Sequence, residues 1–361
     1  MSRFLNARYD KLEPYVPGEQ IQKDKLIKLN TNESPFPPSP KVTEAINSFE
    51  TKRLNRYPDP EAKELIKAVA GFLNISEKNI MAGNGSDELL AFSFMLFQNE
   101  NKKIYFPDIS YGFYKVYAEI YGAYASYIAL DDDLMVNPGD YCDLDGMIVI
   151  ANPNAQTGGA IPRTDVEKIL KANRNNLILI DEAYVNFGAE SSLKLIEKYD
   201  NLLVIQTFSK DRNLAGARIG LAFANEEIIA DLKKAKYSFN PYNLNRLSIL
   251  AGAASVGDNE YYESCLEKII ATREKFIKDI EALGFFVIPS LANFVLARSD
   301  KISGGDYYRE LKEKNILVRH FGDERICDYV RITIGNDEEM EALIAATAEI
   351  LKKEGDNNEE D

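Results

Sequence analysis

The sequence predicts an α/β fold, with a large domain built on a mostly parallel sheet and a smaller α+β domain. Between residues 60 and 224, short apolar segments alternate with amphipathic ones, as strands and covering helices do. After Pro241 the pattern changes to a long helical stretch at 259–283, followed by strands interleaved with helices. A chain of 361 residues with 45% hydrophobic residues can bury more than one core, so two domains are expected.

We expect an N-terminal arm over residues 1–30 that joins the small domain and a dimer interface, a large domain over 31–248, and a small domain over 249–361. Residues 1–58 are rich in Pro and Asn, which favours turns over regular elements. Strands of the large domain are expected at 103–106, 125–130, 146–152, 176–183, 201–209 and 218–224.

The composition excludes several classes of function. A net charge of −14 argues against a nucleic-acid partner, and no polybasic run indicates a membrane surface. No apolar stretch approaches the roughly 20 residues of a membrane span, so we expect a cytoplasmic protein. Three widely spaced cysteines and a single histidine, His320, predict neither a metal site nor a Ser-His-Asp triad. Acid–base chemistry therefore falls to lysine, tyrosine or carboxylates.

The segment TFSKDRNLAGARIG, residues 207–220, brings a lysine to the end of an expected strand. A lysine amine attacks an aldehyde only when it is neutral, so a reactive lysine needs surroundings that lower its pKa. Arg218 is a candidate for the cation that lowers the pKa of Lys210. The alternative is an ordinary surface lysine in a turn.

Two further segments place polar residues beside buried strands. In NLILIDEAYVNF, Asp181 ends a strand and Tyr184 follows, at the edge where open α/β sheets bind ligands. A buried carboxylate there needs a cationic partner, although an Asp in this place also caps helices. In MAGNGSDELL, Gly85, Ser86 and Asp87 lead from a strand into a helix start, which suits a phosphate or a plain N-cap.

In their order, over roughly residues 30–335, these segments resemble the motifs of class I/II aminotransferases, which are fold-type I enzymes dependent on pyridoxal 5'-phosphate (PLP). The resemblance implies that Lys210 forms an imine with PLP and transfers the proton, and that Asp181 pairs with the ring nitrogen. It implies that Tyr184 bonds the phenolic oxygen and that Tyr111 stacks on the ring. The residues implied to hold the cofactor phosphate are Gly85, Ser86, Asp87, Ser209 and Arg218.

The segment ANPNAQTGG departs from the family's Asn-Pro-x-Asn-Pro-Thr-Gly loop. Ala155 stands where the family has the Asn that reaches the phenolic oxygen, and Gln156 stands in place of the Pro. Asn154 is expected to substitute for the missing Asn. If Asn154 does not reach the phenolic oxygen, Tyr184 is expected to be its one hydrogen-bond partner.

The resemblance is closest to histidinol-phosphate aminotransferases, and three stretches carry it. They are LNTNESPFPPSP, NRYPDP, and the pair ILVRH and YVRITIG. The similarity implies a homodimer with shared sites, in which Tyr57 reaches the partner's cofactor phosphate. It implies histidinol phosphate and glutamate or 2-oxoglutarate as substrates, in histidine biosynthesis. The implied substrate-binding residues are Tyr15, Asn32, Arg319 and Arg331.

Three alternatives remain open. One is a PLP-dependent phospho-amino-acid decarboxylase of the phosphothreonine type, which shares the fold and the site. A second is an aminotransferase for another phosphorylated amine or for an aromatic amino acid. The third is a regulator that keeps the fold and the cofactor but acts through protein binding.

Overall fold

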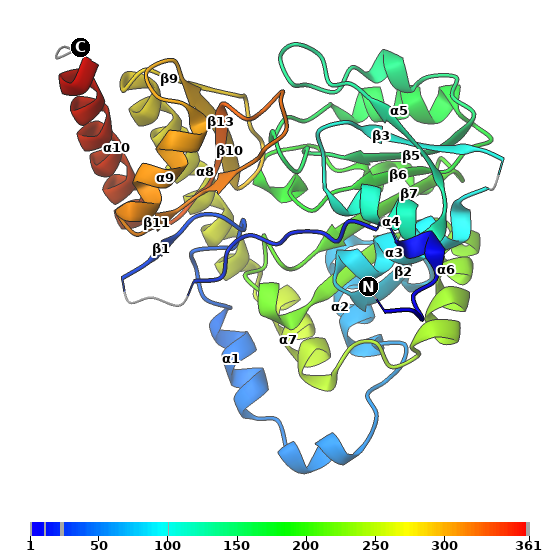
Figure 1. The fold of residues 1–361 in the computed structure, drawn as a ribbon. Coiled ribbons are helices and arrows are strands. Elements are labelled where there is room, and N and C mark those ends of the chain that lie inside the picture. The colour runs from blue at the N-terminus through cyan, green and yellow to red at the C-terminus, as the bar shows by residue number, and fades with distance from the viewer. Residues whose placement is uncertain (1, 11, 22–24, 100, 359–361) are drawn as a thin grey trace.

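The computed structural model describes residues 2–10, 12–21, 25–99 and 101–358, which form two bodies joined by the N-terminal arm (Figure 1). A seven-stranded sheet forms the centre of the larger body, and a four-stranded sheet forms the centre of the smaller one. No helix among the described residues has both the length and the apolar character needed to cross a membrane.

The large sheet has the strand order β2-β8-β7-β6-β5-β3-β4. Strands β3 to β7 run parallel, whereas β8 is antiparallel to both of its neighbours. The prediction of a mostly parallel sheet is confirmed, and so are the six strands predicted for it by residue range. The bounds are β2 Ile80–Asn84, β3 Lys103–Pro107, β4 Tyr124–Ile128, β5 Gly146–Ala151, β6 Ile178–Asp181, β7 Leu202–Thr207 and β8 Ile219–Phe223.

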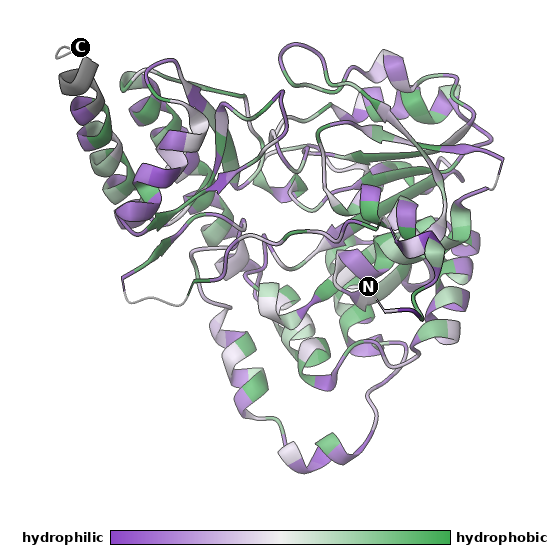
Figure 2. Ribbon diagram, viewed as in Figure 1, coloured by the Kyte–Doolittle hydropathy of each residue, from purple (hydrophilic) through white to green (hydrophobic). Residues whose placement is uncertain are grey.

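Helices cover both faces of this sheet. Successive side chains of each strand point to opposite faces, so alternate residues pack against different groups of helices. On β6, Leu179 packs in the cluster that contains α3 Ser86–Phe97, α4 Phe113–Tyr121 and α6 Glu226–Phe239. The next residue, Ile180, packs in the cluster that contains α2, α5 and α7. Figure 2 shows the result, with strands that are hydrophobic along their length and helices that are hydrophobic in stripes. The bounds of that second group are α2 Lys63–Leu73, α5 Arg163–Ala172 and α7 Arg246–Val256.

The smaller body is an antiparallel sheet of order β12-β13-β10-β9 with three helices beside it. The arm joins this body through β1 Ile27–Lys28, which pairs in parallel with β11 Ile316–Leu317. The domain boundary expected at 248 stays a prediction, and α7 runs across it. The other bounds are α8 Asn259–Ala282, β9 Phe285–Val287, β10 Phe294–Ser299, α9 Gly304–Glu313, β12 Arg319–His320, β13 Tyr329–Thr333 and α10 Asp337–Asn358.

The expectation of turns alone in residues 1–58 was wrong for α1, Pro40–Asn47. The hydroxyl of Ser39 accepts a hydrogen bond from the Val42 N–H and so caps the helix. Pro40 occupies the first helical position, where the missing N–H would have had no partner in the helix. A Pro-rich segment can therefore begin a helix. In Figure 1, α1 and the segment after it extend away from both sheets.

Candidate active site

A cavity lies at the carboxyl ends of the parallel strands, where the arm and the smaller body face the large sheet. Asp181 ends β6 in register with Ala151 at the end of β5, and Lys210 follows β7 by three residues. The cavity brings together most of the residues singled out from the sequence. Those from the larger body are Ser86, Asp87, Tyr111, Asp181, Tyr184, Ser209, Lys210 and Arg218. Those from the arm and the smaller body are Tyr15, Asn32, Arg319 and Arg331.

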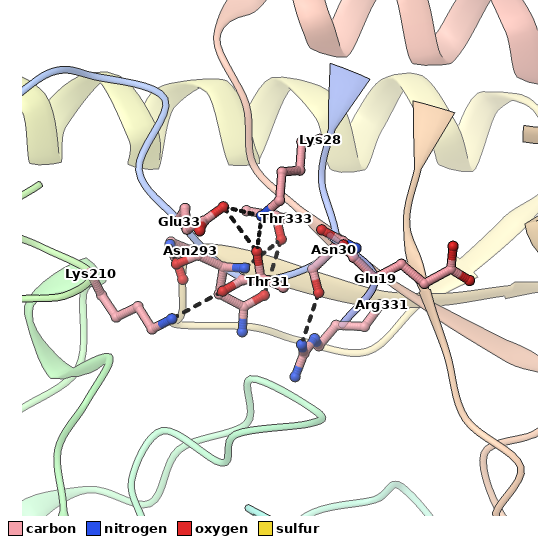
Figure 3. A network of polar contacts seen from close by, with 10 residues as sticks. Glu19, Lys28, Asn30, Thr31, Glu33, Lys210, Asn293, Arg331 and Thr333 are labelled. Atoms are coloured by element: carbon pink, nitrogen blue, oxygen red, sulfur yellow. Dashed lines mark hydrogen bonds and ion pairs between the residues drawn. The ribbon is translucent and has the colours of Figure 1, made fainter. Parts of the chain in front are cut away.

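Lys210 is half-buried, and its Nζ donates a hydrogen bond of 3.0 Å to the carbonyl of Thr31 in the arm (Figure 3). Burial lowers the pKa of Lys210 to about 8, and the charge of Arg331 is the second cause. Arg218, the cation expected from the sequence, also lowers this pKa but contributes less than Arg331. A large part of the Lys210 side chains would therefore be neutral near pH 8, as a nucleophilic amine requires.

Asp181 is 4% exposed, and its carboxylate accepts one side-chain hydrogen bond from the described residues. The hydroxyl of Tyr114 in α4 donates to Oδ2 at 2.7 Å. The other oxygen, Oδ1, accepts no hydrogen bond of normal geometry from the described residues. Burial raises the pKa of Asp181 to about 6, and the Tyr114 hydrogen bond opposes this rise. Nothing in the sequence separates Tyr114 from a packing tyrosine, so its role was missed.

The start of α3 forms a concave surface suited to an anion. Gly85 has φ +81°, and a Cβ there would lie 2.5 Å from Nη2 of Arg218, so the close approach requires glycine. The first N–H groups of α3 and the positive end of its dipole lie beside Arg218. Ser209 Oγ lies 3.5 Å from Arg218 Nη1. Gly85 thus contributes by its backbone, although it does not itself line the cavity.

Asp87 holds two of these residues in place. Its Oδ2 pairs with Arg218 at 2.9 Å, and its Oδ1 accepts a hydrogen bond of 2.7 Å from the Tyr111 hydroxyl. The ring of Tyr111 is therefore fixed at its outer end while it lines the cavity. The carboxylate also offsets part of the charge of Arg218, so the concave surface keeps only a partial positive charge.

The hydroxyl of Tyr184 accepts a hydrogen bond of 3.0 Å from the Asn32 amide. Asn32 is itself held by the smaller body, because Thr333 Oγ1 donates to its Oδ1 and Asn293 donates to its carbonyl. Figure 3 shows this arm segment between Lys210 and the strands of the smaller body. Asn32 therefore links the position of Tyr184 to that of the smaller sheet.

Asn154 does not line the cavity, although the sequence suggested it as a cofactor ligand. Its amide nitrogen donates to the Ile109 carbonyl at 2.9 Å, and its Oδ1 accepts from the backbone N–H groups of Gln156 and Thr157. The side chain is thus used to shape its own loop. Ala155 lines the cavity in its place, which leaves Tyr184 as the candidate for the phenolic oxygen.

Tyr57 lies outside the cavity of its own chain. Its side chain is 75% exposed, its ring stacks on Tyr242 at 4.3 Å between centroids, and its carbonyl accepts a hydrogen bond from Arg246. A role in this site would need a second copy of the chain, as the sequence-based interpretation supposed.

Arg319 is anchored to the N-terminal arm. Its guanidinium donates to the carbonyls of Val16 and Pro17 at 3.0 and 3.3 Å, so it holds the arm over the cavity. Tyr15 directly precedes these two residues in the arm, and its ring stacks on that of Phe113 with 4.3 Å between the ring centroids. The donors of Arg319 are thus partly engaged within the protein.

Arg331 enters the cavity from β13. Its Nη1 donates to the Ala155 carbonyl at 2.8 Å and to Oε1 of Gln156 at 3.0 Å, and its Nη2 lies 3.4 Å from the Asn30 carbonyl. Gln156 also lines the cavity, and no motif had assigned it a role. The one feature of the sequence that could have drawn attention to Gln156 is that it replaces the Pro of the family's loop.

Comparison with known proteins identifies the family. A family model described as aminotransferase class I and II matches residues 24–346. A relative from Brachyspira hyodysenteriae (strain ATCC 49526 / WA1), named histidinol-phosphate aminotransferase, is 48% identical over 353 residues, or 98% of this chain and 100% of the relative.

Solved structures share the architecture. The histidinol-phosphate aminotransferase from Clostridium acetobutylicum superimposes with a TM-score of 0.83 at 28% identity, over 91% of this chain and all of the other. The L-threonine-O-3-phosphate decarboxylase from Porphyromonas gingivalis has a TM-score of 0.79 at 21% identity over the same shares, which shows the fold alone. The predicted fold class is confirmed, and this chain belongs to the aminotransferase class I and II family.

Proposed function

We propose that this protein is a PLP-dependent aminotransferase in which Lys210 holds the cofactor covalently. The pairing of Lys210 and Asp181 carries the proposal. One is an amine whose pKa is lowered to about 8, and the other is a buried carboxylate with one oxygen that has no hydrogen-bond partner among the described residues. The two lie at the ends of adjacent strands and face one cavity. Such a pair suits a cofactor with an aldehyde and a protonated ring nitrogen.

The residues present fit PLP. When bound, PLP supplies an aldehyde that condenses with amines and a ring that takes up electrons from the substrate carbon. Lys210 would attach it, Asp181 would face its ring nitrogen, and Tyr184 would bond its phenolic oxygen. Tyr111 would lie against the ring. The backbone at Gly85, Ser86 and Asp87, together with Ser209 and Arg218, would hold its phosphate.

The protein's own groups then have separate tasks. Lys210, once free, carries a proton to and from the reacting carbon, which its lowered pKa favours near neutral pH. Asp181 keeps a cation in place beside it, because an ionised carboxylate buried without a partner is unfavourable. Tyr111 and Tyr184 would hold and orient the cofactor ring.

We propose histidinol phosphate as amino donor and 2-oxoglutarate as acceptor, in histidine biosynthesis. The name of the relative with 48% identity supports this substrate. The chemistry of Arg331 supports it too, because a guanidinium pairs with phosphate in one half-reaction and with carboxylate in the other. Tyr15, Asn32 and Arg319 complete the proposed substrate side.

We propose that the working form is a homodimer with shared sites. Aromatic and aliphatic side chains are exposed together on the segment after α1 and around the end of α6. The most exposed are Leu54 at 60%, Tyr57 at 75% and Phe239 at 74%. A second copy would cover this surface, and Tyr57 would then reach the partner's cofactor phosphate.

Lys210→Ala should abolish the visible absorbance of the protein-bound cofactor and essentially all turnover, because both attachment and proton transfer are lost. In the wild-type chain, freed of cofactor, the rate of PLP attachment should rise with pH through about 8, since the neutral amine is the reactive form. Exposed Lys78→Ala serves as the control. A midpoint at the ordinary lysine value of roughly 10.4 would contradict the proposed environment.

Tyr114→Phe should shift the acidic limb of the pH profile of kcat/KM upward. The Tyr114 hydrogen bond lowers the pKa of Asp181, so its loss raises that pKa above the present value of about 6, and the carboxylate is protonated at higher pH. Tyr141→Phe is a matched control, because it removes a buried hydroxyl that has no hydrogen-bond partner among the described residues. Identical profiles for the two variants would refute the role of Tyr114.

The substrate proposal is tested by half-reaction rates with histidinol phosphate, histidinol, aromatic amino acids and phosphothreonine. Histidinol phosphate should be the preferred substrate. Arg331→Ala should weaken the binding of both histidinol phosphate and glutamate by about 1.5–3 kcal/mol, the size of a charged hydrogen bond. Preference for aromatic amino acids would overturn the substrate assignment. Release of carbon dioxide from phosphothreonine would instead favour a decarboxylase.

The shared-site proposal is tested by co-expressing Tyr57→Ala and Lys210→Ala chains that carry different tags. Each variant alone should be nearly inactive, whereas purified mixed dimers contain one site with both native residues. The purified mixed dimers should therefore recover about half of the wild-type activity. If mixed dimers are as inactive as their parents, the two residues do not serve one site from different chains.

A further inference from the structure

Gln156 bridges three segments of the cavity wall. Its Nε2 donates to the Ser110 carbonyl at 3.1 Å, and its Oε1 accepts from Nη1 of Arg331 at 3.0 Å. Its backbone N–H is fixed by Asn154. The amide orientation follows from these partners, because a carbonyl can only accept and a guanidinium can only donate. Neither a carboxylate nor an apolar side chain could make both contacts.

The surroundings of Arg331 keep its guanidinium in place without cancelling its charge. The guanidinium carbon lies 5.1 and 5.4 Å from the ring centroids of Phe294 and Phe321. Its three hydrogen-bond acceptors, two backbone carbonyls and the Gln156 amide, are all neutral. Its Nε has no hydrogen-bond partner among the described residues.

Arg218, which also lines this cavity, differs from Arg331 in this respect. Its guanidinium is paired with the carboxylate of Asp87 at 2.9 Å. A carboxylate at position 156 would give Arg331 the same kind of partner and would compete with an incoming anion. A neutral amide of that length orients the guanidinium and leaves its charge available.

We propose that Gln156 is a positioning residue for anion binding, which holds Arg331 toward the carboxylate or phosphate of the substrate while leaving its charge uncancelled. The proposal rests on the proposed function, and it deepens it by naming the residue that tunes the anion subsite. Through the Ser110 carbonyl, the same amide also ties this subsite to the segment that carries Tyr111.

Two variants of the holoenzyme separate orientation from charge. Gln156→Met keeps the length of the side chain but loses both hydrogen bonds, whereas Gln156→Glu keeps an acceptor for Arg331 and adds a negative charge. Exposed Asn101→Asp is the control for an amide-to-acid change. Half-reactions are followed with histidinol phosphate and glutamate, which carry an anionic group, and with histidinol, which has none.

We expect Gln156→Glu to raise KM for both anionic substrates by about tenfold or more, the size of one charged hydrogen bond, with kcat within about twofold. Gln156→Met should raise it less. The values of kcat/KM for histidinol and the absorbance of the bound cofactor should stay at the wild-type level. An equal loss with histidinol would mean a merely structural role, and an unchanged KM in both variants would overturn the proposal.

A direct binding measurement keeps the proposal testable if the substrate assignment fails. Calorimetry with inorganic phosphate probes the anion subsite of the holoenzyme without turnover, and Arg331→Gln gives the baseline. Binding weakened in both Gln156 variants would support the proposal even if histidinol phosphate proved not to be the substrate. Wild-type affinity in both variants would reject it, whatever the substrate is.

Discussion

Asp181 ends a strand whose other residues are apolar, and burial alone would keep its carboxyl neutral at acidic pH. Among the described residues only Tyr114 gives it a side-chain hydrogen bond, and its Oδ1 has no hydrogen-bond partner there, although Asp181 lines the cavity. A buried ionised carboxylate of this kind requires a cation nearby. The rigid strands β5, β6 and β7 fix its place, so whatever binds here must present that cation at one defined point.

The remaining charges are arranged around this requirement. The charge of Arg218 is partly offset by Asp87, whereas the hydrogen-bond acceptors of Arg331 among the described residues are neutral and leave its charge uncancelled. Arg331 is the larger electrostatic cause of the low pKa of Lys210, whereas the carboxylate of Asp87 raises that pKa and so opposes the smaller effect of Arg218. An anion held by Arg331 would offset its charge and raise the pKa of the free lysine. Substrate binding and the basicity of Lys210 are thus linked through one guanidinium.

The features predicted from the sequence were local ones. The strands were predicted because buried parallel strands are continuous apolar runs, and Lys210 and Asp181 because each directly follows or ends such a run. Helix α1 was missed because the prolines around it outweighed the single capping residue Ser39. Asn154 was given a role at the cavity because its position in the chain matched, but its amide satisfies the backbone of its own loop.

Contacts between distant segments could not be predicted, and they set the chemistry of the site. Lys210 meets the Thr31 carbonyl 179 residues away, and Gln156 meets Arg331 across 175 residues. The segment that carries Asn30, Thr31 and Asn32 lies between Lys210 and the smaller body (Figure 3). On the side of the larger body, Asn32 also donates a hydrogen bond to Tyr184. Because β1 pairs with β11, a shift of the smaller body would move this segment and Arg331 together. The same shift would change the anion subsite and the surroundings of Lys210 at once.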